Sequence, residues 1–403
     1  MKKTIFFVFI SYTILILGFF LNADPNGGAF NDYINHIRVI KNFSNDFHAT
    51  FYNYDQYATR HSPVLYIIIS LFYKIGIPDQ LIRFFSVHFA LLLPFIFYKC
   101  LLIKFPKINK EYLILCSCII LFSPTFWSLS IWPDSRLFGL IFFCLSIFYF
   151  LKFKIKKNFK NSFKCVLAYT LSSYLSPNFA VFSIFYFYFF FIEFRFNKEI
   201  FLIILINLIF ALPAFLYLFS LDNLFILNPA TPGGIGEIDS FNINNKILII
   251  SSILFFYLIP FIFIRSINLN FLNLKFVIFS ILIVLFLSLN FNYNTKLTGG
   301  GIFLNASNYL FDNNLFFLLI CVPAILSILN ISKINKINIL ILLLILISNP
   351  QYTIYHKYYD PLIFILIILI FELKINIKKL FNYRSIMFFY LYSGLFLILN
   401  FFK

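Results

Sequence analysis

Long apolar runs separated by short polar segments dominate the chain. A helix that crosses a bilayer needs about 20 mainly apolar residues. The runs predict an all-α polytopic membrane protein with about 11 to 13 transmembrane helices, several of which need flanking residues to reach that length. The predicted spans are residues 4–21, 81–103, 112–126, 137–151, 165–175, 178–194, 200–219, 247–264, 274–289, 315–329, 339–347, 362–371 and 385–402.

The longest polar stretch, Asn22 to His61, follows the first apolar run. The first run is long for a cleaved signal peptide and lacks a good small-residue cleavage site, so we interpret it as a retained anchor. The run after the polar stretch, Pro63–Tyr73, is too short to span and suits a helix lying at the interface. We therefore expect residues 22–80 to form a large first extracytoplasmic loop bearing interfacial helices.

Composition supports the membrane class. Of the 403 residues, 61% are hydrophobic and 12% are charged, whereas soluble domains carry about 25% charged residues. The net charge of +17 does not indicate nucleic-acid binding, because the excess lies in short loops without a basic face or binding motif. With 63–73 kept at the interface, most of the 32 Lys and Arg fall on the cytoplasmic side, as the positive-inside rule requires.

We expect one integral membrane domain over residues 1–403. It comprises the first loop, a helical module at 81–194, and C-terminal helices at 195–403 with extracytoplasmic loops at 220–246, 290–314 and 348–361. The six cysteines lie in or beside apolar runs, so we expect core packing and no disulfide framework. The glycine-rich segments 231–236 and 299–301 lack the strand–helix context of a nucleotide loop and suit loops that cap an acceptor.

Several stretches share an order of residue types with a known family. In the first loop, Asp32 and His36 form Asp-x-x-x-His. Residues 60–102 place a charged residue before a proline and a short aromatic helix, then a glycine turn and an arginine that opens a long helix. The next two stretches are LFSPTFWSLSIWPDSRLFGLIFF and, near the end, YHKYYDPLIFIL. The residues that carry the pattern are His61, Pro63, Tyr66, Gly76, Arg83, Pro124, Pro133, Asp134, Arg136, His356, Lys357, Tyr358 and Pro361.

This order resembles the GT-C membrane glycosyltransferases, especially the bacterial protein-mannosyltransferase-like group, over residues 1–150 and the late stretch. The chain departs from the family's pattern in lacking a clear Asp-Glu pair in the first loop and in having Lys357 where Arg is common. The resemblance implies transfer of a sugar from a polyprenyl-phosphate donor to a glycan, lipid or protein acceptor. It also implies a bacterial inner (plasma) membrane, an extracytoplasmic active site and a role in cell-envelope polysaccharide biosynthesis.

Such a transfer needs a base for the acceptor hydroxyl and positive charge, or a divalent metal such as Mg or Mn, for the leaving phosphate. Asp32 is the first candidate for the base, with His36 one helical turn away to orient it or to bind phosphate or metal. Asp24 is the rival, although an Asp-Pro beside a span also serves to end a helix. Asp134 is either a second active-site acid or a helix N-cap.

For the lipid phosphate, cations and histidines near the interface are the candidates. The alternative for each Lys or Arg is snorkelling toward headgroups, and for each His an ordinary loop position. The phosphate candidates are Arg60, His61, Arg136, His356 and Lys357. His88, inside a predicted span, is interpreted as a neutral histidine bonded across helices.

Two other functions are open to a polytopic membrane protein. A polysaccharide polymerase or ligase usually carries its large loop in the second half of the chain, whereas here the largest loop comes first. A flippase or transporter usually shows inverted repeats and ionisable groups at mid-membrane, and the chain has no clear internal repeat. The resemblance therefore favours the glycosyltransferase.

Overall fold

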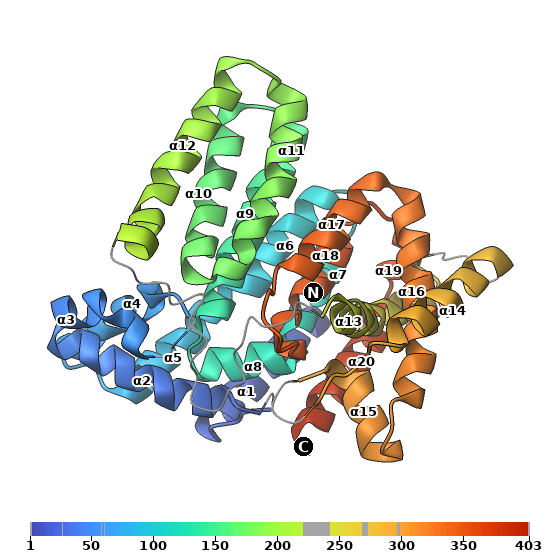
Figure 1. Ribbon diagram of the computed structural model, residues 1–403, viewed down its shortest axis with the longest axis horizontal. Helices are drawn as coiled ribbons and strands as arrows, with labels where there is room; N and C mark the ends of the chain where they lie inside the picture. Colours follow the sequence, from blue (N-terminus) through green and yellow to red (C-terminus); the bar gives the residue numbers. More distant parts are fainter. Residues whose placement is uncertain are drawn as a thin grey trace. The chain divides into compact units, whose positions relative to one another are not determined.

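The computed structural model describes residues 2–25, 27–57, 59, 61–220, 242–267, 273–295 and 299–401, and in this part the chain is helical without strands (Figure 1). The α-helices are α1 (Lys2–Phe20), α2 (Ala29–Asn45), α3 (Phe47–Tyr52), α4 (Pro63–Lys74), α5 (Asp79–Ala90), α6 (Leu92–Lys104), α7 (Lys110–Cys118), α8 (Pro124–Ile131), α9 (Ser135–Ile155), α10 (Phe159–Leu175), α11 (Ser183–Phe194), α12 (Lys198–Phe215), α13 (Ile243–Phe263), α14 (Leu274–Ser288), α15 (Gly301–Phe311), α16 (Leu315–Ile334), α17 (Lys336–Ile347), α18 (Leu362–Leu369), α19 (Ile377–Leu380) and α20 (Tyr383–Phe401). Short helical turns are η1 (Tyr54–Tyr57), η2 (Ile119–Phe122), η3 (Pro177–Phe182), η4 (Leu216–Ser220) and η5 (His356–Tyr358).

Seven of the described helices are long and apolar enough to cross a membrane, and an eighth forms if α7–η2 and α8, bent by 68°, count as one span. The seven are Asp79–Lys104, Ser135–Ile155, Pro177–Phe194, Lys198–Phe219, Ile243–Phe263, Leu315–Ile334 and Tyr383–Phe401. They make the chain a helical membrane protein. Four shorter apolar helices also occur: Thr4–Phe20, Pro63–Lys74, Leu274–Ser288 and Lys336–Ile347.

Within the described residues, seven or eight helices reach spanning length by themselves, and the prediction of 11 to 13 spans stays a prediction. The clearest difference from that prediction is at 362–371, where α18 has only 8 residues. Every side chain of α18 is buried against protein. Eight helical residues rise only about 12 Å. Hydropathy does not distinguish an apolar run surrounded by protein from one surrounded by lipid. It therefore predicted a membrane span at 362–371, where the structure has a short buried helix.

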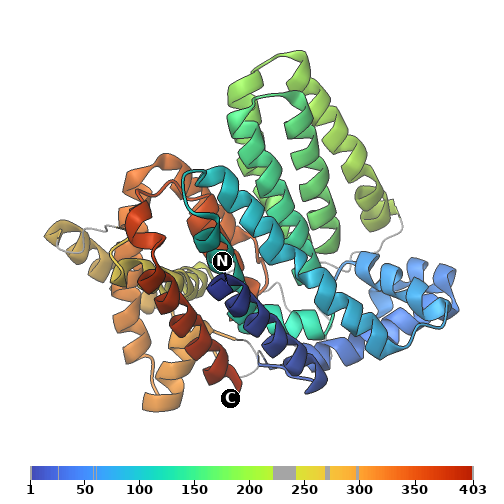
Figure 2. The same ribbon diagram turned by 180° about the vertical axis from the view of Figure 1, so that it is seen from behind.

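The chain divides into two compact units, residues 1–228 with 389–403, and residues 229–388. In the first unit, α1 lies along the C-terminal part of α20, with the rings of Phe7 and Tyr390 6.2 Å apart (Figure 2). The second unit is built around α13 and α16, against which α14, α15, α17 and α18 pack. The predicted boundaries at residues 80 and 194 stay predictions.

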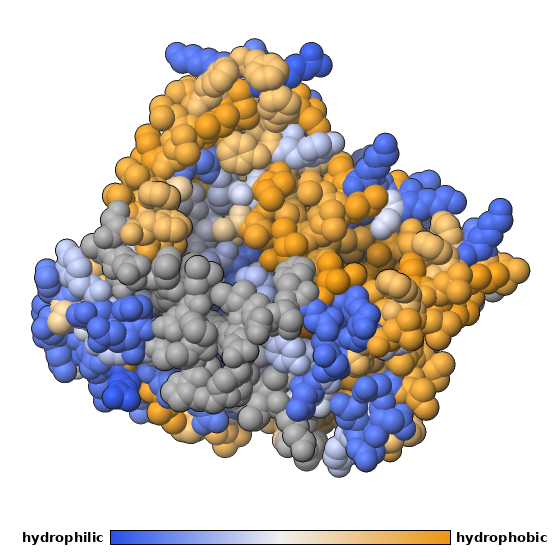
Figure 3. Space-filling model, viewed as in Figure 1, coloured by the Kyte–Doolittle hydropathy of each residue, from blue (hydrophilic) through white to orange (hydrophobic). Residues whose placement is uncertain are grey.

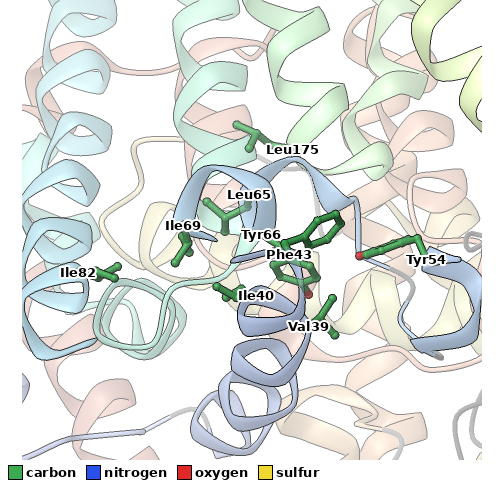
Figure 4. Close-up of a cluster of buried hydrophobic side chains, with 9 residues drawn as sticks. All are labelled: Val39, Ile40, Phe43, Tyr54, Leu65, Tyr66, Ile69, Ile82 and Leu175. Atoms are coloured by element: carbon green, nitrogen blue, oxygen red, sulfur yellow. The ribbon is translucent and has the colours of Figure 1, made fainter. Parts of the chain in front are cut away.

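The predicted first loop contains α2, α3, η1 and α4, none of which is both long and apolar enough to span a bilayer. Residues Ala29, Tyr33, His36, Ile40 and Phe43 of α2 are buried at alternating spacings of four and three, which places them on one helical face. That face packs on α4 in a core cluster drawn in Figure 4. The cluster consists of Val39, Ile40, Phe43, Tyr54, Leu65, Tyr66, Ile69, Ile82 and Leu175.

Helices α9 to α12 form a column within the first unit, in which α9 and α10 approach closely (Figure 1). The Ser172 hydroxyl donates to the carbonyl of Gly139 at 2.7 Å. A Cβ at Gly139 would lie 2.8 Å from the Cβ of Ser176 and 3.2 Å from the Phe179 ring. Glycine at 139 is therefore needed for the close approach of α9 to the C-cap of α10 and to η3.

We expect Gly139→Ala to lower the free energy of unfolding by about 1–3 kcal/mol, the usual cost of forcing a methyl group into a packed contact. The matched control is Gly394→Ala in α20, where the new Cβ meets nothing nearer than 3.9 Å. Alanine favours a helix over glycine by about 1 kcal/mol, so the control should be neutral or stabilising. Thermal unfolding of the full chain in detergent measures both, and equal stability of the two variants would contradict the packing argument.

Candidate active site

The start of α2 is set by Asp24. One carboxylate oxygen of Asp24 accepts the backbone N–H groups of Gly28 at 2.9 Å and Phe30 at 3.0 Å. Gly28 has φ of 104°, a left-handed conformation that favours glycine. Asp24 also lines a cavity of about 730 Å³ with Trp127 and residues of α1 and α20. Its described contacts are those of a residue that ends one helix and starts the next, the alternative weighed from the sequence.

Helix α2 carries both residues of the Asp-x-x-x-His pattern. His36 is buried in the face that packs on α4, and Asp32 is partly exposed one turn earlier. A further anchor lies beside them: the hydroxyls of Tyr33 and Tyr73 both donate to one oxygen of Asp79 at 2.5 Å. These bonds tie α2 to α4 and α5, so the position of Asp32 is fixed by three helices.

His61 lies directly before α4 and meets His36. Their ring centroids are 4.6 Å apart, and the His36 ring is 4.9 Å from that of Tyr66. Nδ1 of His61 is 3.0 Å from the hydroxyl oxygen of Ser135, the first residue of α9. The structure therefore brings together residues from the first loop and from the start of α9.

Asp134 is the N-cap of α9. Its Oδ1 accepts the N–H of Arg136 at 2.7 Å, and the side chain is only 2% exposed. Oδ2 is buried and has no hydrogen-bond partner within the described part of the chain. Asp134 is thus the cap proposed as one alternative from the sequence, and it also has an acceptor oxygen that the cap does not use.

The charges around Asp134 keep it ionised. Burial by itself would raise the pKa of Asp134, but the Arg136 guanidinium, helped by the hydrogen bond from the Arg136 N–H, holds that pKa well below its usual range. Burial lowers the pKa of His61 to about 3, with Asp134 and Asp32 opposing that shift and His36 and Arg136 adding to it. Near neutral pH the cluster therefore consists of an ionised Asp134, a cationic Arg136 and a neutral His61.

Arg83, which sequence reasoning named only as part of a pattern, supports this region. It is 7% exposed, and its guanidinium carbon lies 3.6 Å from the ring centroid of Trp132. Its Nε donates to the carbonyl of Ile131 at 3.0 Å and an NH2 group donates to Asn22 Oδ1 at 2.8 Å. Arg83 thereby holds the turn before Asp134 against the end of α1.

A groove of about 690 Å³ is lined mainly by residues of α4, α10 and α12, and its lining includes Ser62 and Pro63, the two residues that follow His61 in the sequence. The polar groups along it bond to helix backbone: the Tyr174 hydroxyl donates to the carbonyl of Phe210 at 2.6 Å, and the Asn207 amide to that of Ile203 at 2.7 Å. The remaining lining is mainly apolar. Such a groove suits a hydrocarbon chain.

The other predicted site residues lie elsewhere or are not described. Arg60 and the glycine-rich segment 231–236 lie outside the described residues. His356 and Lys357 belong to the second unit. There, the Tyr257 hydroxyl is 3.0 Å from Nε2 of His356 and donates to Asp360 Oδ1 at 2.6 Å. Lys357 Nζ lies 5.2 Å from the ring centroid of Tyr355.

His88 forms the bond across helices that its interpretation required, with Nε2 3.0 Å from the hydroxyl of Tyr12. All six cysteines are buried and free. In the ranges that the structure describes, no three His, Cys, Asp or Glu side chains are grouped so as to hold a metal ion. A role for Mg or Mn stays a prediction.

No protein-family model, no curated protein and no solved structure matches this chain. The resemblance described above therefore rests on the residues themselves.

The lowered pKa of His61 predicts an acid sensitivity. The unfolded chain binds a proton on His61 below about pH 6.5, whereas the folded chain does so only near pH 3. The folded state therefore loses stability as pH falls from about 6.5 toward 3. We expect His61→Gln to flatten the decline of the thermal midpoint between pH 7 and pH 4, as followed by unfolding in detergent.

The matched control is His48→Gln, because His48 is exposed on α3 and is not among the groups that shift the pKa of His61 or of Asp134. This control should decline with pH as the wild type does. An unchanged slope in His61→Gln would show that His61 is not held neutral by its surroundings.

Proposed function

We propose that this membrane protein transfers a sugar from a polyprenyl-phosphate donor to an acceptor hydroxyl. The observation that carries the proposal is the buried Asp134 with Arg136, His61 and His36 near it, together with an apolar groove whose lining includes Ser62 and Pro63, next to His61 in the sequence. A lipid-linked donor has two parts that would match these features: a phosphate for Arg136 and His61, and a long hydrocarbon for the groove. The resemblance to GT-C glycosyltransferases supplies the reaction.

In the proposed reaction, Asp32 removes the proton from the acceptor hydroxyl. The acceptor oxygen forms a bond to the anomeric carbon as the bond from that carbon to the phosphate oxygen breaks. The electron pair and the negative charge stay on the leaving phosphate, which Arg136 stabilises and to which neutral His61 donates a hydrogen bond. Asp134 balances the charge of Arg136 and holds the N-terminus of α9 in place.

The first test replaces the two acids. Asparagine caps a helix about as well as aspartate, so Asp134→Asn removes the charge and keeps the cap. We expect Asp32→Asn to lower the transfer of radiolabel from polyprenyl-phosphate sugars in membranes by about 10²–10⁴-fold. Asp134→Asn should lower it by about 10²-fold.

Asp46→Asn is the matched control, because Asp46 is an exposed N-cap of α3 in the same loop. It should keep the wild-type rate. Full activity in both Asp32→Asn and Asp134→Asn would contradict the assignment of the site.

The second test concerns the groove. Ala211 of α12 lines it, so Ala211→Phe should occupy the space that the hydrocarbon needs. We expect a higher KM for a long polyprenyl-phosphate donor and an unchanged KM for a short-chain, water-soluble analogue, both followed by radiolabel transfer. Leu212→Phe is the control, because Leu212 is 52% exposed and does not line the groove. Equal effects of Ala211→Phe on both donors would place the hydrocarbon elsewhere.

A further inference from the structure

Basic residues gather at one end of the α9–α12 column. They lie in the α9–α10 and α11–α12 turns and in the adjoining helix ends. These two turns meet: Lys157 Nζ lies 2.6 Å from Glu193, and the rings of Phe153 and Phe194 are 5.6 Å apart. We name this set the basic crown. It consists of Lys152, Lys154, Lys156, Lys157, Lys160, Lys164, Arg195 and Lys198.

The basic crown has a large positive net charge. Its eight cations face two acids, Glu193 and Glu199, which leaves a net charge of 8 − 2 = +6. Lys157 already uses Glu193. Helix α10 has no acid in its first turn to offset Lys160 and Lys164. Repulsion among so many cations favours an anion from outside the chain.

Two lysines of the basic crown converge on one aromatic ring. Lys152 comes from the last turn of α9 and Lys164 from α10. Their Nζ atoms lie 5.9 Å and 5.5 Å from the ring centroid of Tyr149. Lys152 is also 4.3 Å from the centroid of Phe148. Two ammonium groups from neighbouring helices thus lie near a single aromatic ring, and both can donate hydrogen bonds to a phosphate.

The surface next to the basic crown is apolar. Figure 3 shows hydrophilic residues at the end of the column above a hydrophobic belt. On α10, Leu167 and Leu171 are 39% and 41% exposed, and they follow Lys164 at spacings of three and four that keep one helical face. A lipid whose headgroup binds Lys164 would therefore have its acyl chain along these leucines. An inorganic anion at the same place would leave the leucines exposed.

We propose that the basic crown binds the phosphate of an anionic bilayer lipid, with Lys152 and Lys164 on either side of the headgroup and the acyl chain along Leu167 and Leu171. This site is separate from the proposed sugar transfer. Lysines near a membrane surface attract anionic lipids. The partner is a lipid such as phosphatidylglycerol. It would come from the bilayer leaflet that lies at this end of the column.

The test measures the rise in thermal midpoint when lipid is added to the detergent-solubilised full chain. Phosphatidylglycerol should raise the midpoint in a saturable way, and phosphatidylcholine or inorganic phosphate should not. The double variant Lys152→Gln/Lys164→Gln should need about 30-fold more phosphatidylglycerol for the same rise, given the usual attraction of two surface lysines. Lys152→Arg/Lys164→Arg keeps the charge and should respond as the wild type does.

Lys107→Gln/Lys110→Gln is the matched control, because it removes the same charge from the exposed α6–α7 turn. It should keep the wild-type response. A further arm needs no variant: in about 1 M NaCl, where the screening length falls to about 3 Å, the wild-type response should disappear.

An equal rise with phosphatidylcholine would overturn the proposal, as would a response that survives in Lys152→Gln/Lys164→Gln. A rise in the thermal midpoint with inorganic phosphate but not with phosphatidylglycerol would overturn the lipid proposal, because the ligand would then be a free anion. If the glutamine variant does not fold, a salt-resistant wild-type response still overturns the proposal.

Discussion

A carboxylate that is almost completely buried beside a membrane helix needs polar partners, and those of Asp134 come from three parts of the chain. Arg136 comes from its own helix, His61 from the segment before α4, and His36 from α2. Each partner loses a favourable interaction if its segment moves, because an unbalanced charge in a poorly solvated place is costly. The arrangement of α2, α4 and α9 in the first unit therefore depends on this one acid.

The proposed chemistry uses the same polar partners. In that proposal, Arg136 and neutral His61 would meet the leaving phosphate, and the apolar groove whose lining includes Ser62 and Pro63 would take the hydrocarbon. The partly exposed Asp32 lies on a helix that Asp79 anchors through Tyr33 and Tyr73. A site built on packed helices keeps its groups in position better than one built on loops alone.

Local patterns predicted much of this from the sequence. The spacing of Asp32 and His36 on one helix, the short helix at 63–74 and the Asp134 cap all follow from neighbours a few residues apart. The anchor of Tyr33 and Tyr73 on Asp79 was not predicted, since it requires the packing of three helices. The burial of residues 362–369 inside the protein was not predicted for a similar reason, because hydropathy alone does not show whether protein or lipid surrounds an apolar run.

The six cysteines have a practical consequence. All are buried, and the most exposed of them, Cys118, shows 7% of its surface. Reagents that modify thiols need access to the sulfur. The native chain should therefore give little background with a membrane-impermeant maleimide, and a single cysteine introduced on an exposed turn can report sidedness without first removing the natural thiols.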